Sequence, residues 1–544
     1  MRIALLFLLL PFTHVVLAQE PDIIPRPVEI KSPAQPGKFM ITTSTSIVLQ
    51  GAGLEQSADF LKDYLRTYHG VNLSVVKNAK TKNAILLNYE RTNKAIPGGY
   101  KLEVKSGSIK ISGDNEEGVF YGIQTLIQLL PVAPNKMAGA PVSFVQITDY
   151  PRFSYRGLHL DVCRHFFPVS YLKKYIDYIA LHKMNYFHWH LTDDQGWRIE
   201  IKKYPLLTEV GATRHGTIVG RYPGKTNDSI RYGGFYTQDE IRDVVKYAAA
   251  RYITVIPEIE LPGHASAAIA AYPKLSCFPE ERTLPPAKSP WWSGDTTGKQ
   301  LQQTWGVFPD VFCPSDYTFQ FLEGVLDEVV ELFPAKYIHI GGDECPKDNW
   351  KRSEFCQNLI KERGLKDEHG LQSYFIQRME KYLNGKGKQI IGWDEILEGG
   401  LAPNATVMSW RGEQGGITAA SQDHYVIMTP SSHLYFDHKQ QTKEDSVTIG
   451  NYTPVEKIYG YEPISVKLPE GKEQFILGAQ ANLWTEYIGN TRKLEYMLFP
   501  RMAALSEMLW SPKDKRNFAN FEKRLPSQLK RYKRWNINYN AVLK

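Results

Sequence analysis

Two adjacent carboxylates follow a short apolar run and a pair of glycines in the stretch Tyr337–Cys345, read as Tyr-Ile-His-Ile-Gly-Gly-Asp-Glu-Cys. The apolar half has the pattern of a buried parallel strand, and the glycines let a backbone or a ligand approach closely. Asp343 and Glu344 then stand at its carboxyl end, where such acids can transfer protons. Successive side chains of a strand point to opposite faces, so both acids reach one ligand only if the chain already turns there. The alternative is a strand-end turn with two solvated acids.

The rest of the chain favours the catalytic interpretation, because other apolar runs also end in polar or aromatic side chains. In chain order these are Asp161, Arg164, His188, His190, Asp193, Asp194, Glu258, Glu260, His264, Trp393, Asp394, Trp410, Tyr435, Asp437, Trp484 and Glu486. Carboxylates suit acid–base work, an arginine fork suits hydroxyls, and indole faces suit a sugar ring. This inventory predicts a pocket for a neutral sugar.

Apolar runs recur from Pro151 onward, and most are followed by a polar end and then a helical pattern. They are Tyr155–Val162, Tyr186–Leu191, Tyr252–Leu261, Tyr337–Ile340, Gln389–Trp393, Thr406–Trp410, Tyr425–Thr429 and Phe475–Leu483. This number and order predict a (β/α)₈ TIM barrel over residues 151–515, with the site at the carboxyl ends of its strands. An open doubly wound sheet is the alternative, but no Gly-x-Gly-x-x-Gly follows any of these strands.

Residues 20–150 read as a separate, small α+β domain, because short strand patterns there alternate with two helical patterns. Pro131–Pro141 has the composition of a linker to the barrel. In the tail, 516–544, the stretch Phe518–Trp535 is a basic amphipathic helix that we expect to pack on the outside of the barrel.

The N-terminal residues have the pattern of an export signal. Met1-Arg2 precedes the apolar run Ile3–Leu10, and Ala18 offers a small residue before Gln19. We expect residues 1–18 to be a signal peptide, and the mature protein to be periplasmic or extracellular. No later segment is long and apolar enough to span a bilayer. A net charge of +7 over 544 residues is mild, and no basic block flanked by aromatics indicates nucleic acid.

Five cysteines leave at least one thiol unpaired in an exported chain. Cys277 and Cys313 bracket a loop rich in Pro and Trp, so a disulfide between them is the preferred pairing; the alternative is that all five are reduced and buried. No Cys-x-x-Cys is present, which argues against a structural zinc site. His188, His190 and Asp193 resemble a metal site, but nothing ties a third ligand to them. We predict core histidines, no metal and no cofactor.

The residues at the strand ends resemble the β-N-acetylhexosaminidases of glycoside hydrolase family 20. The stretches that carry the resemblance are Gly118-Val-Phe-Tyr-Gly-Ile-Gln-Thr-Leu126, Gly157-Leu-His-Leu-Asp-Val-Cys-Arg164, His188-Trp-His-Leu-Thr-Asp-Asp194, Pro262-Gly-His264, His339-Ile-Gly-Gly-Asp-Glu344, Gly392-Trp-Asp394, Ser409-Trp410, Tyr435-Phe-Asp437 and Asn482-Leu-Trp-Thr-Glu486. They run in the family's order from the small domain to near the C-terminus. Glu260 is a small departure, because family members often carry Asp there.

The resemblance implies substrate-assisted retaining hydrolysis, in which the 2-acetamido oxygen of the sugar attacks C1. Glu344 would be the general acid and then the base, and Asp343 would hold the acetamido N–H and stabilise the oxazolinium intermediate. Tyr435 would donate to the acetamido oxygen. A charged Asp343 should raise the pKa of Glu344 and keep it protonated near neutral pH.

The resemblance also implies the remaining pocket. Arg164 and Glu486 would hold the C3, C4 and C6 hydroxyls, and Asp437 would add a contact near C4 or C6. The roles of lining the acetamido methyl and the ring would fall to Trp393, Trp410 and Trp484. His264 and Asp193 would form a relay that tunes Glu344. The alternatives are structural: Arg164 in an ion pair with Glu486 or Asp161, and the tryptophans in the core.

The expected function is therefore removal of terminal β-linked GlcNAc, or also GalNAc, from glycans or chitin fragments. The alternative is a sugar-binding protein that kept the pocket and lost turnover. Such a protein would be expected to have lost Glu344 or Asp343, and both are present. Preference between the two sugars depends on the room around the C4 hydroxyl, and the oligomeric state stays open.

Overall fold

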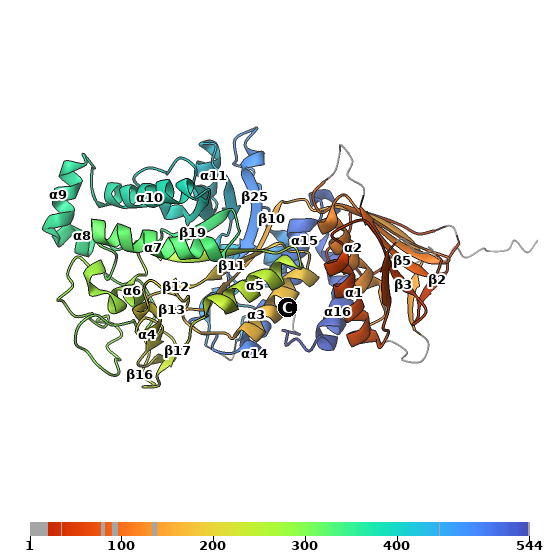
Figure 1. Ribbon diagram of the computed structural model, residues 1–544, viewed down its shortest axis with the longest axis horizontal. Helices are drawn as coiled ribbons and strands as arrows, with labels where there is room; N and C mark the ends of the chain where they lie inside the picture. Colours follow the sequence, from red (N-terminus) through yellow and green to blue (C-terminus); the bar gives the residue numbers. More distant parts are fainter. Residues whose placement is uncertain are drawn as a thin grey trace, which may run out of the picture.

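A computed structural model describes residues 20–33, 35–77, 82–89, 96–132, 139–444 and 447–541. The predicted signal peptide, residues 1–18, lies outside these ranges. Two bodies lie side by side: a mixed sheet with its helices at one end of the molecule, and a larger barrel at the other (Figure 1).

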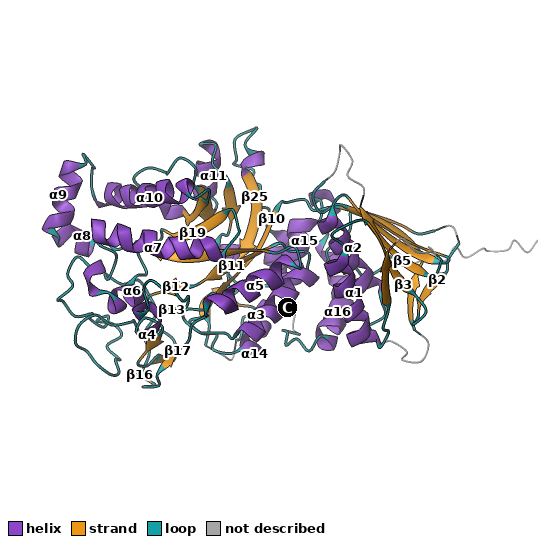
Figure 2. Ribbon diagram, in the orientation of Figure 1, coloured by secondary structure: helices purple, strands orange, loops and turns teal. Residues whose placement is uncertain are grey.

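The larger body is a closed barrel of eight parallel strands that pair in chain order. Its strands are β10 (Tyr155–Asp161), β11 (Tyr186–His190), β18 (Thr254–Leu261), β19 (Tyr337–Gly341), β20 (Gln389–Trp393), β21 (Thr406–Ser409), β22 (Val426–Met428) and β25 (Ile476–Ala481). Each falls within a residue or two of a predicted apolar run. The predicted (β/α)₈ fold is confirmed, and every strand is nearly continuous in buried residues because helices cover the outside (Figure 2).

Helices follow most barrel strands, as the apolar spacing predicts. Those that cover the barrel are α3 (Val169–Leu181), α5 (Gln238–Ala249), α7 (Asp316–Leu332), α10 (Glu368–Gly385), α11 (Gln414–Ser421), α13 (Val455–Gly460), α14 (Thr491–Leu498) and α15 (Arg501–Trp510). After β20, the 3₁₀ turn η2 (Asp394–Leu397) takes the place of a long helix. Short helices in the long loops are α4 (Leu206–Glu209), α6 (Ser266–Ala271), α8 (Asp348–Arg352), α9 (Glu354–Glu362) and α12 (Ser431–Leu434).

The smaller body is a seven-stranded mixed sheet in the order β1-β9-β6-β7-β5-β3-β4. Its strands are β1 (Glu29–Lys31), β3 (Ser46–Gln50), β4 (Ser74–Lys77), β5 (Ala84–Tyr89), β6 (Tyr100–Lys105), β7 (Ser108–Gly113) and β9 (Val145–Asp149). Two helices, α1 (Glu55–His69) and α2 (Glu116–Leu129), cover the face toward the barrel (Figure 2). This arrangement matches the α+β domain expected from the sequence.

The linker prediction for Pro131–Pro141 is wrong at its carboxyl end. Residues 133–138 lie outside the described ranges, but Ala140 already opens β8 (Ala140–Ser143), which pairs with β2 (Lys38–Ile41). The following strand, β9, enters the main sheet beside β6. The chain therefore completes the small domain before it enters the barrel. Short strands of this kind have too little apolar pattern to be recognised in the sequence.

The C-terminal helix α16 (Phe518–Arg534) lies between the two bodies rather than on the barrel alone (Figure 1). Toward the barrel, the Arg524 guanidinium contacts both carboxylate oxygens of Glu507, each at 2.7 Å. Toward the small domain, Arg524 also donates to the Ile23 carbonyl and Trp535 Nε1 donates to the Tyr64 hydroxyl. The helix does pack on the barrel as expected, and its arginines also bind carbonyls of the small domain.

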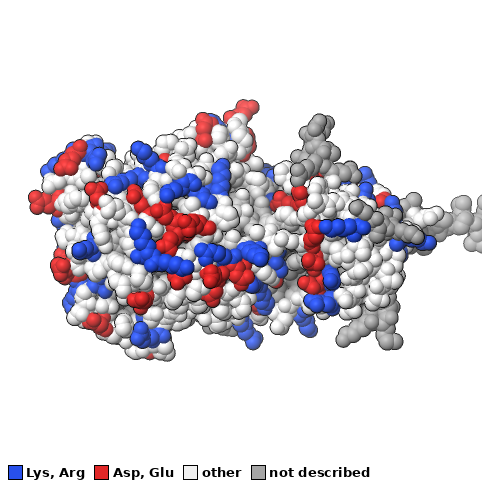
Figure 3. Space-filling view, viewed as in Figure 1, with Lys and Arg blue, Asp and Glu red and all other residues white. Residues whose placement is uncertain are grey.

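None of the helices in the described ranges is long and apolar enough to span a membrane. On the face shown in Figure 3, acidic and basic side chains are interspersed over both bodies. This face carries no basic stripe of the kind that binds nucleic acid, in keeping with the mild net charge.

Candidate active site

All predicted site residues line one cavity of about 290 Å³ at the carboxyl ends of the barrel strands. They are Arg164, Asp193, His264, Asp343, Glu344, Trp393, Trp410, Tyr435, Asp437, Trp484 and Glu486. Residues up to about three hundred positions apart meet there because the strands are parallel and the barrel is closed, so every carboxyl end opens onto the same mouth.

The chain turns sharply after β19, as two acids on one pocket require. Gly341 and Gly342 have φ of 66° and 90°, and a Cβ on Gly341 would stand 1.8 Å from Glu260 Oε2. Glu344 itself has φ of 40°, a conformation that costs a residue with a side chain about 1–3 kcal/mol. The turn sends both carboxylates into the cavity. Asp343 lies at its floor with a side chain 11% exposed, and Glu344 lies at its mouth with 39%.

His264 connects the two acids to a buried pair of aspartates. Its Nε2 lies 3.5 Å from Glu344 Oε2 and 3.7 Å from Asp343 Oδ2. Its Nδ1 donates to Asp194 Oδ2 at 3.0 Å and lies 3.3 Å from Asp193 Oδ1. Burial works to lower the pKa of His264, but these carboxylates outweigh burial and raise that pKa well above its usual value. His264 is therefore a cation held against both acids.

Arg164 reinforces the same side of the pocket. Its guanidinium lies 2.8 Å from Asp193 Oδ2 and 3.5 Å from Asp161 Oδ2, and its Nε donates to Gln195 Oε1 at 2.9 Å. Arg164 thus forms the structural ion pair with Asp161 that was the alternative in the sequence analysis. Its second ion pair, with Asp193, was not predicted. The guanidinium also lies 5.2 Å from the ring centroid of Trp484, so it faces the cavity.

The proton of the Asp343–Glu344 pair sits on the opposite residue from the one predicted. Burial raises the pKa of Asp343 to about 7, with the charge of Glu344 adding to the rise. Burial also works to raise the pKa of Glu344, but the hydrogen bond and charge of His264, with Arg164, leave it below its usual value. The prediction failed because it considered the charge of Asp343 next to Glu344 and not the charge of His264, which comes from another strand end.

Aromatic side chains form another part of the cavity lining. Trp410 and Tyr435 lie nearly parallel, with ring centroids 6.2 Å apart and an interplanar angle of 21°. Two of the indoles are held in place by hydrogen bonds to carboxylates. Trp393 Nε1 donates to Glu258 Oε1 at 2.8 Å, and Trp410 Nε1 donates to Glu395 Oε2 at 2.9 Å. Trp393 is buried, as the core alternative held, yet it lines the cavity too.

The wall formed by Asp437 and Glu486, here called the hydroxyl wall, is polar but poorly satisfied. Within the described ranges, neither carboxylate oxygen of Asp437 and not the Oε2 of Glu486 has a hydrogen-bond partner. Burial raises the pKa of Asp437, and the charge of Glu486 adds to the rise. Burial also raises the pKa of Glu486, against the opposing charge of Arg164. Buried polar atoms of this kind normally mark a place where a ligand supplies the missing bonds.

The side formed by Asp193, His264, Asp343 and Glu344, here called the relay side, rests on a buried histidine cluster. The Glu258 carboxylate lies 2.9 Å from His339 Nδ1 and 3.1 Å from His188 Nε2, and it also contacts His190 Nδ1. His190 Nε2 in turn donates to Asp193 Oδ2 at 2.8 Å. The predicted burial of His188 and His190 is confirmed, and His339, Glu258 and Glu260 are buried as well.

Sequence reasoning missed several residues of the cavity. They are Ser431, His438, Ile449 and Asn451, which line it, and Glu395 and Gln195, which hold other lining residues in place. Glu395 follows Trp393-Asp394, so its place at a strand end was a usable signal. Ile449 and Asn451 come from the short strand β24 (Ile449–Tyr452), which pairs with β23 (His438–Lys439) and has no such pattern.

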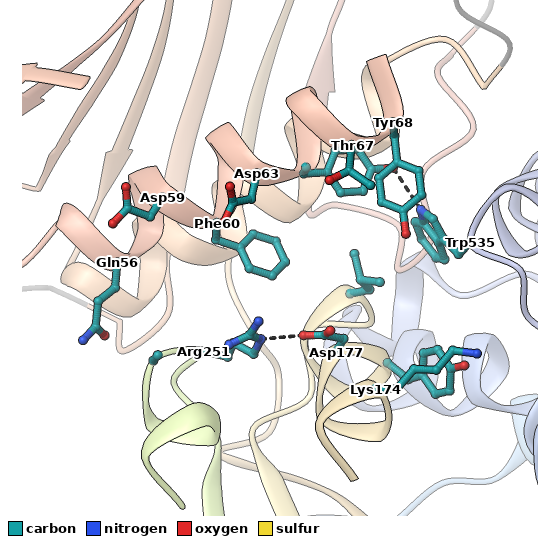
Figure 4. A pocket seen from close by; sticks show the side chains of 14 residues that line it. Gln56, Asp59, Phe60, Asp63, Thr67, Tyr68, Lys174, Asp177, Arg251 and Trp535 are labelled. Carbon is teal, nitrogen blue, oxygen red and sulfur yellow. Dashed lines mark hydrogen bonds and ion pairs between the residues drawn. The ribbon is translucent and has the colours of Figure 1, made fainter. Parts of the chain in front are cut away.

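A second cavity, of about 400 Å³, lies between the small domain and the barrel (Figure 4). Phe60 and Tyr68 of α1 and Trp535 face it, and the Arg251–Asp177 ion pair, 2.6 Å, crosses its other side. Of its lining residues, Arg251 and Asp177 pair with each other, and the cavity holds none of the acids at the strand ends. The strand-end cavity, though smaller, is the one with free polar atoms and convergent acids.

Comparison with known proteins agrees with the geometry. The catalytic-domain model of glycosyl hydrolase family 20 matches residues 153–513, and the family's domain 2 matches residues 20–150. A beta-hexosaminidase of Porphyromonas gingivalis is 46% identical over 96% of this chain and 64% of its own length; one of Vibrio furnissii is 37% identical over 89% and 76%. The chain thus spans less than two thirds of the length of the first relative.

Among solved structures, the exo β-N-acetylglucosaminidase of family 20 from Vibrio harveyi, in complex with N-acetylglucosamine, superposes with a TM-score of 0.83. It is 34% identical, and the match covers 96% of this chain and 79% of that one. The two family matches together take in the mixed sheet, the barrel and every strand end that contributes to the cavity. The chain belongs to glycosyl hydrolase family 20.

Proposed function

We propose that the chain is an exo-acting β-N-acetylhexosaminidase that releases terminal β-linked GlcNAc, or also GalNAc, by substrate-assisted retaining hydrolysis. The observation that carries the proposal is the turn after β19, which puts Asp343 at the floor and Glu344 at the mouth of one cavity. A glycosidic oxygen lies on the open side of a bound terminal sugar, where Glu344 stands. The 2-acetamido group would lie deeper, beside Asp343.

In the proposed reaction, the acetamido oxygen attacks C1 while Glu344 gives its proton to the leaving oxygen. Asp343 accepts the acetamido N–H; its Oδ1 is buried and has no hydrogen-bond partner among the described residues. Tyr435, which lines the same end of the cavity, donates to the acetamido oxygen. Positioning of this kind supplies several kcal/mol of the barrier. Water, activated by Glu344, then opens the oxazolinium ring with overall retention.

The proton arrangement gives the proposal a specific first step. In the free site the pKa of Asp343 is about 7 and that of Glu344 is low, so the one shared proton is on Asp343. An ionised Asp343 accepts the acetamido N–H more strongly than a protonated Asp343 does. Binding therefore transfers this proton to Glu344, whose pKa rises when the sugar covers it and Asp343 becomes charged. Substrate itself creates the general acid.

The proposed pocket contacts follow from which atoms are free. Asp437 and Glu486 offer acceptors for the sugar hydroxyls. Arg164, which lines the cavity beside Asp193, offers donors. The indoles Trp393, Trp410 and Trp484 supply apolar faces for the ring and the acetamido methyl. His264 and Asp193 hold Glu344 in orientation. Asn451 lies at the rim, where room around the C4 hydroxyl is decided.

The deciding experiment compares hydrolysis of an aryl β-GlcNAc and an aryl β-glucoside by the wild type and by Glu344→Gln. We expect turnover of the first substrate alone, and loss of it in the variant. Cleavage of both substrates would show that the acetamido group is not the nucleophile, so the roles of Asp343 and Tyr435 would fail. If neither were cleaved but GlcNAc still bound, the chain would be a sugar-binding protein on this fold.

We also propose that the protein is exported to the periplasm or beyond. The support is the charged start, apolar run and small residue of positions 1–18. N-terminal sequencing of protein recovered from periplasm and medium should begin at Gln19. A chain that starts at Met1 and stays with the cytosolic fraction would contradict this.

A further inference from the structure

Three cysteine thiols from distant parts of the chain lie together behind the relay side. Cys277 follows the 3₁₀ turn η1 (Pro273–Leu275), Cys313 precedes α7, and Cys356 lies in α9. Their sulfur atoms all lie within 4.8 Å of one another, and Cys277 Sγ is 3.5 Å from Cys356 Sγ. All three are free thiols, so the expected Cys277–Cys313 disulfide is not formed in this structure.

The sulfur spacing fits a bound ion better than a bond. A disulfide needs its sulfurs about 2.0 Å apart. Thiolates on a tetrahedral Zn²⁺, with Zn–S bonds of about 2.3 Å, stand about 3.8 Å from one another. The observed 3.5 Å separation is close to the second value. A disulfide would also leave one of the three sulfurs without a bond, whereas a metal ion can bind all three.

The surroundings of the cluster are those of a metal site with one open position. Cys313 and Cys356 are buried against Val311 and Trp350, while Cys277 is partly exposed and opens the cluster to solvent. The hydroxyl of Ser353, which caps α9, lies within hydrogen-bonding range of the Cys277 and Cys356 thiols. A dry pocket with a fourth oxygen at its edge completes a tetrahedron.

We propose that Cys277, Cys313 and Cys356 bind one Zn²⁺ as thiolates, with water or the Ser353 hydroxyl as fourth ligand. Three Zn–S bonds form, three thiol protons pass to the solvent, and no electron is transferred. The ligands are dozens of residues apart, two in loops and one in α9. For that reason no short Cys motif marks the site, and the absence of Cys-x-x-Cys does not argue against it.

The bound ion would hold together the segments that pack against the relay side near His264. Cys313 N–H donates to the Leu275 carbonyl at 2.8 Å, and the neighbouring Phe312 N–H donates to the Pro262 carbonyl at 2.9 Å, two residues before His264. Trp350, which packs on the cluster, donates from Nε1 to the Phe312 carbonyl at 3.0 Å. The role is structural, and it does not depend on the proposed reaction.

The first test measures zinc in the full-length protein, reduced and handled without oxygen. Elemental analysis after gel filtration should find one zinc per chain, and Cd²⁺ titration should give the ultraviolet absorption of thiolate-to-cadmium charge transfer. In Cys356→Ser we expect affinity to fall more than about 100-fold. The matched control is Cys163→Ala, a buried cysteine outside the cluster, which should bind as the wild type does. No retained zinc in the reduced wild type would overturn the proposal, as would unchanged binding in Cys356→Ser.

A second test guards against a variant that fails to fold. Adding zinc to metal-stripped protein should raise the Tm of the wild type and of Cys163→Ala, but not of Cys277→Ser, whose cysteine is the least buried of the three. Mass spectrometry of protein isolated without reductant should find the three thiols unbonded to one another. A disulfide that joins two of them in zinc-free protein would overturn the proposal.

Discussion

The relay side and the hydroxyl wall line the same cavity, yet their polar groups are in opposite states. On the relay side, Asp193 is shared by His190, Arg164 and His264, and burial is outweighed so far that its pKa falls well below its usual value. On the hydroxyl wall, Asp437 is equally buried, has no hydrogen-bond partner in the described ranges, and has a pKa well above its usual value.

The difference separates groups that are already satisfied from groups that await a ligand. Fully paired buried charges fix geometry, and removing one partner leaves the others uncompensated. Unpaired buried carboxyls lower the stability of the free protein. A bound sugar hydroxyl would supply the hydrogen bond that they lack and offset this cost. Mutations on the two sides should therefore separate into effects on chemistry or stability and effects on binding.

The largest effect is expected for Glu344→Gln, which removes the proposed acid and base. General acid–base catalysis is worth about 10²–10⁴ in rate, and both steps use this residue, so kcat should fall by about 10³–10⁴. Steady-state hydrolysis of an aryl β-GlcNAc measures this. Glu362→Gln, an exposed acid on α9, is the control. A fall of less than tenfold would remove Glu344 from the proton transfer.

Asp193→Asn tests whether the relay side is structurally satisfied. The change leaves Arg164 and His264 without their shared carboxylate, and breaking a buried pair of this kind costs about 3–5 kcal/mol. Urea unfolding should show the loss in the free energy of unfolding. An unchanged midpoint would mean that the three partners find other acids, such as Asp194 or Asp161.

Tyr435→Phe tests the proposed donor to the acetamido oxygen while keeping the ring against Trp410. Loss of one positioned donor costs about 10²–10³ in kcat. KM should change little, because the ring stacking stays. A trifluoroacetamido group is a poorer nucleophile than an acetamido group. If Tyr435 acts on this group, the variant and the trifluoroacetamido substrate together should slow cleavage of the aryl glycoside by less than the product of their separate effects. Equal kcat in both proteins would exclude the role.

The pH profile tests the shared proton. Since the free pair holds its proton on Asp343 with a pKa of about 7, that proton is lost as pH rises through this value. We expect kcat/KM to be highest below pH about 7 and to fall about tenfold for each pH unit well above it. Asp343→Asn should lower the whole profile and abolish this limb. A limb that persists in the variant would assign it to another group.

The smallest effect is expected for Asp437→Asn, on the hydroxyl wall. The weaker acceptor should raise KM about tenfold with little change in kcat. The raised pKa means that the ionised form is disfavoured in the folded protein, so stability is lost as pH rises above the ordinary carboxyl value. Removing this charge should leave the free energy of unfolding at pH 7 unchanged or higher by about 1 kcal/mol. A clear destabilisation would mean that the wall is paired after all.

Much of the fold could be predicted because its signals are local. Each buried barrel strand is a near-continuous apolar run, and the run is long enough to stand out in the sequence. The short strands β1 and β8 were not predicted, and the predicted linker ran into β8, since a three- or four-residue strand has no distinctive period. The tail helix was recognised, but its arginines gave no sign that they bind carbonyls of the small domain.

The sequence by itself determined which residues meet. Chain order, the parallel barrel and the turn-forming glycines after β19 bring Asp343, Glu344, Tyr435 and Glu486 to one mouth, whatever the loops do. Only the tertiary structure decided the state of those residues: the proton on Asp343, the cation on His264, the free oxygens of Asp437 and the grouping of three thiols. The physical reason is that desolvation and charge interactions depend on distances between groups far apart in the chain, and those distances exist only once the strands and loops have packed.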